Sequence, residues 1–336
     1  MIDVNKQLEA LKGRKKGLIL THNNPDPDAI ASAEALRLLL SSEAGVPCVV
    51  GYGGIIGRPE NRALCNLLQI PLTPIRHMKI NTYDLVALVD TQPGTGNNEL
   101  PAGHPADIVI DHHPRRDWEP PSPWTEVHED IGATSSICFQ YLQARKVPID
   151  RRLATMLVYG IQTDTMDLGR GAGPEEFRAY FELLPDADPE ILSRIRFPNL
   201  SFKYFKAVTE AIANARIFGK DLVEVTMRTL PYPELPAEMA DFFIRAQGIH
   251  VSFCAGVFQN DLYLSLRTEG DTVKAGELIQ QVAQPLGHVG GHEHAAGGLV
   301  EQVPEDSLGR MMDTLTRRLC DSLGVESESR KFLDLA

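Results

Sequence analysis

Residues 17–33 read GLILTHNNPDPDAIASA, and this stretch joins an apolar strand to an acidic turn and then to a helix. The run at 17–21 has the composition of a buried strand, and residues 29–41 carry apolar side chains at helical spacing. Between them, Pro25 and Pro27 oppose both regular helix and strand pairing. We therefore expect a rigid loop that carries His22, Asp26 and Asp28.

The same alternation of strand and helix recurs through the first half of the chain. Residues 83–90 (YDLVALVD) and 106–111 (ADIVID) are apolar runs that each end on an acid, which is typical of strands buried on both faces of a parallel sheet. The pattern predicts an α/β fold: an N-terminal parallel sheet flanked by helices, and a smaller C-terminal α/β domain with a mixed sheet. Further predicted strands lie at 48–52, 222–227, 249–258 and 262–267, and predicted helices at 59–68, 133–144, 151–163, 202–215 and 273–282.

The length of 336 residues suits two compact domains. Residues 185–200 contain prolines and no long period, so we expect the boundary there. The predicted division is a metal-binding catalytic domain over 1–185, a linker with a connecting helix over 186–217, and a substrate-binding domain over 218–336.

Composition excludes several classes of protein. Hydrophobic residues make up 43% and charged residues 23% of the chain, as in ordinary globular proteins. The sequence has neither a membrane-spanning apolar run nor the apolar core of a signal peptide, which predicts a cytoplasmic protein without a membrane partner. The net charge of −12 opposes binding to duplex nucleic acid but allows a small phosphorylated nucleotide or a short single-stranded oligonucleotide. The five separated cysteines are expected to be reduced thiols.

Acidic and histidine side chains follow the predicted elements of the first half. The set is His22, Asp26, Asp28, Asp90, Asp111, His112, His113 and Asp164. In a parallel sheet the carboxyl ends of all strands share one edge, so these loops should converge, and their carboxylates would repel one another without a cation. The number of ligands indicates two divalent ions, with Mn²⁺ favoured and Mg²⁺, Co²⁺ or Zn²⁺ also compatible. Each segment alone also fits a structural role, such as a helix cap or a turn.

Taken in order, these motifs resemble the DHH phosphoesterases. HNNPDPD is similar to the first motif of that family, Val89-Asp90 to the second, the DHH at 111–113 to the third, and Thr163-Asp164 to the fourth. The resemblance implies that His22 and Asp26 hold one metal, that Asp28, His112 and Asp164 hold the other, and that Asp90 bridges them. Asp111 would orient an imidazole, and His113 would face the substrate phosphate.

The C-terminal stretch VGGHEHAAGG is similar to the associated domain of the first type in that family, although Val289 replaces a customary glycine. Gly290 and Gly291 would allow close backbone approach to an anion, and His292 would donate to it. A simple glycine turn before a final strand is the structural alternative. By the resemblance, Arg267 would grip the substrate phosphate, and the catalytic residues would be His113, Arg267 and His292. Residues 134–136 could bind phosphate at a helix N-terminus or merely cap the helix.

The resemblance implies hydrolysis of a phosphate ester by a water activated between two metals, with the substrate between the domains. The compact architecture is most similar to the nanoRNase and pAp phosphatase branch, which acts on short oligoribonucleotides, linear or cyclic dinucleotides and 3′-phosphoadenosine 5′-phosphate. Two alternatives stay open: an inorganic pyrophosphatase or exopolyphosphatase, and a non-catalytic nucleotide-binding sensor. GGHEHAAGG opposes the pyrophosphatases, whose second domain differs. A homodimer is plausible by resemblance, and the unusual TQPGTGNN after the second motif suggests a subgroup with its own substrate.

Overall fold

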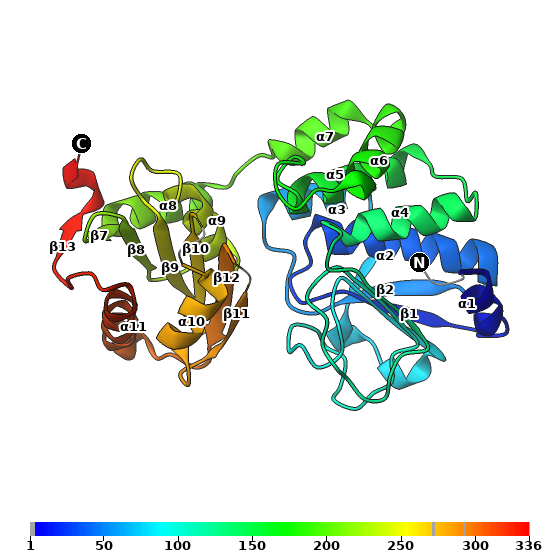
Figure 1. The fold of residues 1–336 in the computed structure, drawn as a ribbon, viewed down its shortest axis with the longest axis horizontal. Helices are drawn as coiled ribbons and strands as arrows, with labels where there is room; N and C mark the ends of the chain where they lie inside the picture. The colour runs from blue at the N-terminus through cyan, green and yellow to red at the C-terminus, as the bar shows by residue number, and fades with distance from the viewer. Residues whose placement is uncertain (1–3, 271–272, 292, 336) are drawn as a thin grey trace. The chain divides into compact units, whose positions relative to one another are not determined.

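A computed structural model describes residues 4–270, 273–291 and 293–335 of the chain. It divides into two compact units, Met1–Pro198 and Asn199–Ala336, and each unit has its own sheet and core (Figure 1). The predicted α/β fold is confirmed, because the first unit contains a parallel sheet and the second a mixed one.

The sheet of the first unit has six parallel strands in the order β3-β2-β1-β4-β5-β6. The strands are β1 (Gly17–Leu20), β2 (Cys48–Tyr52), β3 (Leu72–Pro74), β4 (Leu85–Val89), β5 (Ile108–Asp111) and β6 (Trp124–Val127). Every residue of β1, β4 and β5 is buried, which explains their continuous apolar runs. The strand order reverses between β1 and β4, and in such sheets ligands bind beyond the carboxyl ends of the strands at the reversal.

The helices of the first unit are α1 (Val4–Leu11), α2 (Pro27–Leu39), α3 (Pro59–Leu67), α4 (Thr134–Ala144), α5 (Arg151–Asp164), α6 (Pro174–Leu183) and α7 (Pro189–Arg196). Helices α2, α4 and α5 lie together against one face of the sheet, where their apolar side chains share a core with Ile19, Ala87 and Ile110 (Figure 1). On the other face Leu18 and Leu88 are covered by loop segments and short 3₁₀ turns. Helices therefore pack on one face rather than on both.

One prediction about prolines in this unit is wrong. Helix α2 begins at Pro27, with Asp26 as its N-cap, so Asp28 lies in the first helical turn and not in a loop. Proline fits there because the first turn of a helix leaves its N–H groups unbonded in any case. Residues 185–200, where we expected the boundary, include the division between the two units after Pro198, and they also contain α7, which begins at a proline and is only 8 residues long. A helix that short is hard to detect by periodicity.

The second unit has a seven-stranded sheet in the order β11-β12-β10-β9-β8-β7-β13, in which only β8 and β9 pair in parallel among the described strands. The strands are β7 (Arg216–Phe218), β8 (Leu222–Met227), β9 (Val251–Phe258), β10 (Asp261–Thr268), β11 (His288–Gly291), β12 (Ala295–Val300) and β13 (Ser329–Lys331). The helices are α8 (Phe202–Asn214), α9 (Leu235–Phe243), α10 (Ala275–Ala283) and α11 (Leu308–Leu323). Helices α10 and α11 share a core with one face of the sheet.

The glycine-rich C-terminal motif forms the hairpin of β11 and β12 rather than a turn before a single strand. A Cβ atom on Gly291 would lie 2.4 Å from the carbonyl oxygen of Ala295 and from the Cα of Ala296, so this glycine permits the close approach of the two strands. Within the described ranges, no helix has the length and apolar character needed to cross a membrane.

Candidate metal centre

The turn after β1 places His22 and Asp26 at the carboxyl edge of the sheet. Asp26 caps α2, because its Oδ1 accepts from the backbone N–H of Ala29 at 3.0 Å. The His22 ring has Nδ1 2.9 Å from the carbonyl oxygen of Asn23, so Nδ1 carries the proton and Nε2 is left for other contacts. His22 Nε2 lies 3.7 Å from Asp26 Oδ1 and 3.4 Å from Asp90 Oδ2.

Asp90 lies at the centre of the cluster. It follows β4 with a φ of +60°, a conformation that costs a non-glycine residue of order 1 kcal/mol and that gathers at functional sites. The backbone holds this geometry because its N–H donates to the carbonyl oxygen of Ile110 at 2.9 Å. The carboxylate is buried; Oδ1 accepts from the Thr134 hydroxyl at 2.9 Å and lies 3.5 Å from His112 Nε2.

A second group of ligand atoms is formed by Asp28, His112 and Asp164. Both oxygens of the buried Asp28 accept backbone N–H groups at the start of α4, from Thr134 at 2.7 Å and from Ser135 at 2.9 Å. His112 has Nδ1 3.2 Å from the carbonyl oxygen of Ile131 and Nε2 3.1 Å from Asp164 Oδ2.

Asp164 is the last residue of α5. A carboxylate there faces the negative end of the helix dipole, so its position is unfavourable for the helix itself.

The Asp28 carboxylate occupies the N-terminus of α4. Residues 134–136 were candidates for phosphate binding, but the N–H groups of Thr134 and Ser135 bind the Asp28 carboxylate instead. Thr134 holds two acids at once, Asp28 through its backbone and Asp90 through its hydroxyl. Its sequence context indicated a cap or an anion site, and only the fold reveals which carboxylates it binds.

His113 is hydrogen-bonded to Asp111 and also lies near Asp90, with Nδ1 3.7 Å from Asp90 Oδ1. Its Nδ1 lies 2.8 Å from Asp111 Oδ1, and the same oxygen accepts the backbone N–H of His112 at 3.0 Å. The imidazole that Asp111 orients is thus His113, whereas the carbonyl of Ile131 orients His112.

Burial and neighbouring charges oppose each other at the two histidines His22 and His112, whereas at Asp28 they act together on the pKa. Burial lowers the pKa of His22, but the neighbouring Asp26 and Asp90 outweigh it and raise that pKa well above its usual value. Burial also lowers the pKa of His112, but the carboxylates around the ring outweigh burial, so this pKa is raised as well. For Asp28, burial and the charges of Asp90 and Asp164 all act together to raise the pKa. The metal-free centre therefore retains protons that a bound cation would displace.

Among the residues that the structure describes, three groups of side chains have ligand atoms within 4.8 Å of one another: His22, Asp26 and Asp90; Asp90, His112 and His113; and Asp28, His112 and Asp164. Asp90 belongs to two of them. His112 Nε2 is buried without a hydrogen-bond partner among the described residues, and Asp164 lies close to it without hydrogen-bond geometry. Both His22 and His112 present Nε2 to carboxylates while a backbone carbonyl accepts from Nδ1, as metal-binding histidines usually do. The donor set fits a divalent cation.

The residues expected to bind substrate in the second unit lie around β10 and β11. Arg267 on β10 is engaged by Asp241, with Nε–Oδ1 2.6 Å and Nη2–Oδ2 3.3 Å, and its Nη1 donates to Ser265 Oγ at 2.9 Å. Gly290 and Gly291 are exposed on β11. His292 lies outside the described residues.

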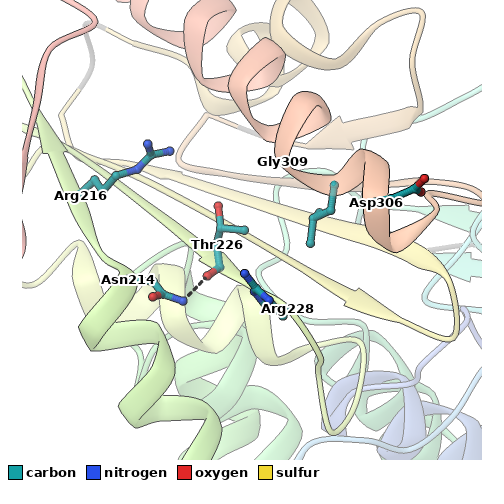
Figure 2. Close-up of a pocket in the computed structure, with 7 residues that line it drawn as sticks. Asn214, Arg216, Thr226, Arg228, Asp306 and Gly309 are labelled. Atoms are coloured by element: carbon teal, nitrogen blue, oxygen red, sulfur yellow. Dashed lines mark hydrogen bonds between the residues drawn. The ribbon is translucent and has the colours of Figure 1, made fainter.

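A cavity of about 780 Å³ in the second unit lies where β7, β8 and the ends of α8 and α11 meet (Figure 2). It is lined by Asn214, Arg216, Thr226, Arg228, Asp306, Leu308 and Gly309. Asn214 donates to the carbonyl oxygen of Thr226 at 3.1 Å, and Arg216 Nη2 lies 2.9 Å from the buried Glu224. These two polar side chains are thus engaged within the unit.

Comparisons with solved structures show the fold. An exopolyphosphatase-related protein from Bacteroides fragilis superimposes with a TM-score of 0.71 at 19% identity, covering 94% of this chain and 95% of that one. RecJ from Thermus thermophilus in complex with Mn²⁺ gives a TM-score of 0.50 at 14% identity, covering 95% of this chain and 55% of that one.

Sequence comparisons show the family. An uncharacterised protein of Methanocaldococcus jannaschii is 32% identical over 334 residues, covering 96% of this chain and 68% of that protein. A probable manganese-dependent inorganic pyrophosphatase of Listeria monocytogenes is 25% identical over 179 residues, covering 53% of this chain and only 58% of its own length. Residues 16–161 match the N-terminal domain of the DHH family, and residues 234–320 match the DHHA1 domain. The chain belongs to the DHH family, with a DHH domain followed by a DHHA1 domain.

Proposed function

We propose that this chain is a divalent-metal-dependent phosphohydrolase that cleaves phosphate esters of small nucleotides. The substrates we propose are short oligoribonucleotides, linear or cyclic dinucleotides, and 3′-phosphoadenosine 5′-phosphate. The observation that carries the proposal is the buried Asp90 carboxylate, whose two oxygens face His22 on one side and His112 on the other. A carboxylate shared by two groups of ligands is what a pair of divalent ions requires.

The centre would hold two ions, with Mn²⁺ favoured and Mg²⁺, Co²⁺ or Zn²⁺ compatible with the same ligands. The names of two relatives support the metal: one is a probable manganese-dependent enzyme, and RecJ was solved with Mn²⁺. The ligands would be His22 and Asp26 for one ion, Asp28, His112 and Asp164 for the other, and Asp90 for both. When bound, such ions supply an activated water nucleophile and neutralise charge on the phosphoryl group.

The chain's own residues orient this centre. Thr134 binds both Asp28 and Asp90 and so fixes them relative to each other. The carbonyl oxygens of Asn23 and Ile131 accept the Nδ1–H groups of His22 and His112, which leaves Nε2 of each ring for the metal. Because Asp28 and Asp90 are buried, their charges are weakly screened by solvent.

His113, held by Asp111, would donate to a phosphoryl oxygen and so stabilise charge as the bond to phosphorus breaks.

Residues of the second unit would recognise the rest of the substrate. Arg267 would bind phosphate, and Asp241 now fills the bidentate face of its guanidinium, so a phosphate would take the place of this carboxylate. Gly290 and Gly291 on β11, together with His292, would contribute to this recognition. For His292→Ala we expect weaker use of substrate with unchanged metal affinity; loss of metal affinity would contradict this division of roles.

A second candidate is an inorganic pyrophosphatase or exopolyphosphatase. It draws support from the names of the bacterial relatives and of the Bacteroides fragilis structure. The DHHA1 match at 234–320 favours the nucleotide substrates instead, because the family resemblance gives pyrophosphatases a different second domain. A third candidate, from another class, is a nucleotide sensor without turnover.

One assay separates these candidates. The metal-free protein is supplied with Mn²⁺ and tested on 3′-phosphoadenosine 5′-phosphate, linear and cyclic dinucleotides, short oligoribonucleotides, pyrophosphate and polyphosphate. We expect turnover of a nucleotide substrate that is absent without metal and absent in Asp90→Asn. Asp313→Asn, in the exposed face of α11, is the matched control and should behave as wild type. Turnover of pyrophosphate alone would favour the second candidate, and nucleotide binding without any turnover would favour the sensor.

A further inference from the structure

The segment TQPGTGNN at 91–98 forms a compact turn directly after Asp90. Its first polar residues are buried, with Thr91 2% and Gln92 1% exposed. The carbonyl oxygen of Gln92 accepts from the Thr95 hydroxyl at 2.8 Å and from Asn98 Nδ2 at 2.8 Å. Contacts within the turn therefore hold the backbone of Gln92 in place, independently of the contacts that its side chain makes.

The Gln92 amide links the turn to the DHH motif. Its Nε2 donates to Asp111 Oδ2 at 2.6 Å and to the carbonyl oxygen of Pro114 at 3.2 Å, and its Oε1 accepts the backbone N–H of Arg116 at 2.8 Å. Only one orientation of the amide satisfies all three contacts, because the reversed one would put Oε1 against a carboxylate and Nε2 against an N–H donor. The side chain thus has a defined position and a defined polarity.

Asp111 depends on this contact. Asp111 is fully buried, and among the described residues its Oδ2 accepts a hydrogen bond from the Gln92 amide. Oδ1 is used by His113 Nδ1 at 2.8 Å and by the backbone N–H of His112 at 3.0 Å. Without Gln92, a buried carboxylate oxygen loses its donor, and the carboxylate gains freedom to rotate away from the imidazole.

We propose that Gln92 is a positioning residue, which holds the Asp111 carboxylate and through it sets the orientation of the His113 imidazole toward the substrate phosphate. This inference rests on the proposed function for the role of His113. It assigns the TQPGTGNN turn a role in the same centre, because the turn follows Asp90 and its Gln92 side chain contacts Asp111 of the DHH motif. It also explains why an uncharged amide is buried beside Asp111, since it satisfies the carboxylate without adding charge.

The first test is spectroscopic and does not need turnover. In the Mg²⁺-loaded protein labelled with ¹⁵N-histidine, we expect a slowly exchanging downfield Nδ1–H signal that disappears in His113→Ala. Gln92→Met keeps the length of the side chain but removes its hydrogen bonds, and it should shift the signal or make it exchange rapidly. Gln143→Met makes the same exchange on the exposed face of α4 and should leave the signal as in wild type. An unchanged signal in Gln92→Met would overturn the inference.

The second test is a kinetic cycle on whichever phosphate substrate the wild type hydrolyses. Gln92→Met should lower kcat about 10- to 100-fold, the usual effect of removing a partner that orients a functional group in a metal site, with a smaller change in KM. In a His113→Ala background the same substitution should change kcat less than about threefold, because the residue it orients is gone. An equal loss in both backgrounds would refute a role through His113.

The two tests also separate this inference from the proposed function. If the wild type turns over none of the phosphate compounds, the proposed function fails, and the histidine signal still decides whether Gln92 holds the Asp111–His113 pair. If turnover is found but the cycle is additive, the function stands and the inference fails.

Discussion

Thr134→Val should weaken divalent-metal binding without unfolding the site. The substitution keeps the β-branched shape and the backbone N–H that binds Asp28, and it removes the 2.9 Å hydrogen bond from the hydroxyl to Asp90 Oδ1. A hydrogen bond to a charged group contributes about 1.5–3 kcal/mol, and each 1.4 kcal/mol corresponds to a factor of about ten. We therefore expect Mn²⁺ affinity to fall about 10- to 100-fold.

Thr134→Ser is the matched control, because it keeps the hydroxyl and should bind Mn²⁺ with an affinity close to that of wild type. The assay is calorimetric titration of Mn²⁺ into chelator-treated protein, with the thermal transition recorded for each variant. Equal affinities in wild type and Thr134→Val would refute the idea that the hydroxyl positions Asp90. An equal loss in both variants would indicate a packing effect rather than the lost hydrogen bond.

We expect three further outcomes, two at the metal centre and one in the second unit. Asp90→Ala should abolish both metal binding and turnover, the latter by several orders of magnitude, and near-normal turnover would refute a shared carboxylate. In metal-free protein, the raised pKa values of His22 and His112 contribute stability that is complete below about pH 6.5 and is lost as pH rises through the folded-state values, so the melting temperature should fall above about pH 6.5 and Mn²⁺ should remove that fall. A pH-independent melting temperature would contradict the linkage. Gly291→Ala should lower the melting temperature, since its Cβ would meet the backbone of Ala296 at 2.4 Å; an unchanged transition would show that β11 can shift at little cost.

The edge where the acids converge was predictable because apolar runs that end on acids identify parallel strands. Asp90 follows β4 and Asp111 ends β5, and the sheet order brings both beside the turn after β1. Sequence alone could not locate Asp28 in a helix, because the prolines around it suggested a loop. Helix α2 begins at Pro27 because the Asp26 side chain caps it by accepting the backbone N–H of Ala29, and the sequence does not show whether this hydrogen bond forms.

The residues that support the acids were beyond prediction for a different reason. Thr134 and Gln92 are ordinary polar residues whose roles arise from partners 44, 106 and 19 positions away in the chain. No local pattern records such contacts, since they form only when α4 and the turn after β4 pack against the strand ends. Arg267 is a different case: the family resemblance singled out this residue, but no sequence pattern indicated its pairing with Asp241.

The most direct test of the central claim is an anomalous diffraction measurement on crystals grown with Mn²⁺. We predict two anomalous peaks about 3.5–4 Å apart, with the carboxylate of Asp90 between them, His22 and Asp26 at one, and Asp28, His112 and Asp164 at the other. A single peak, or peaks that do not involve Asp90, would contradict the proposed dinuclear centre.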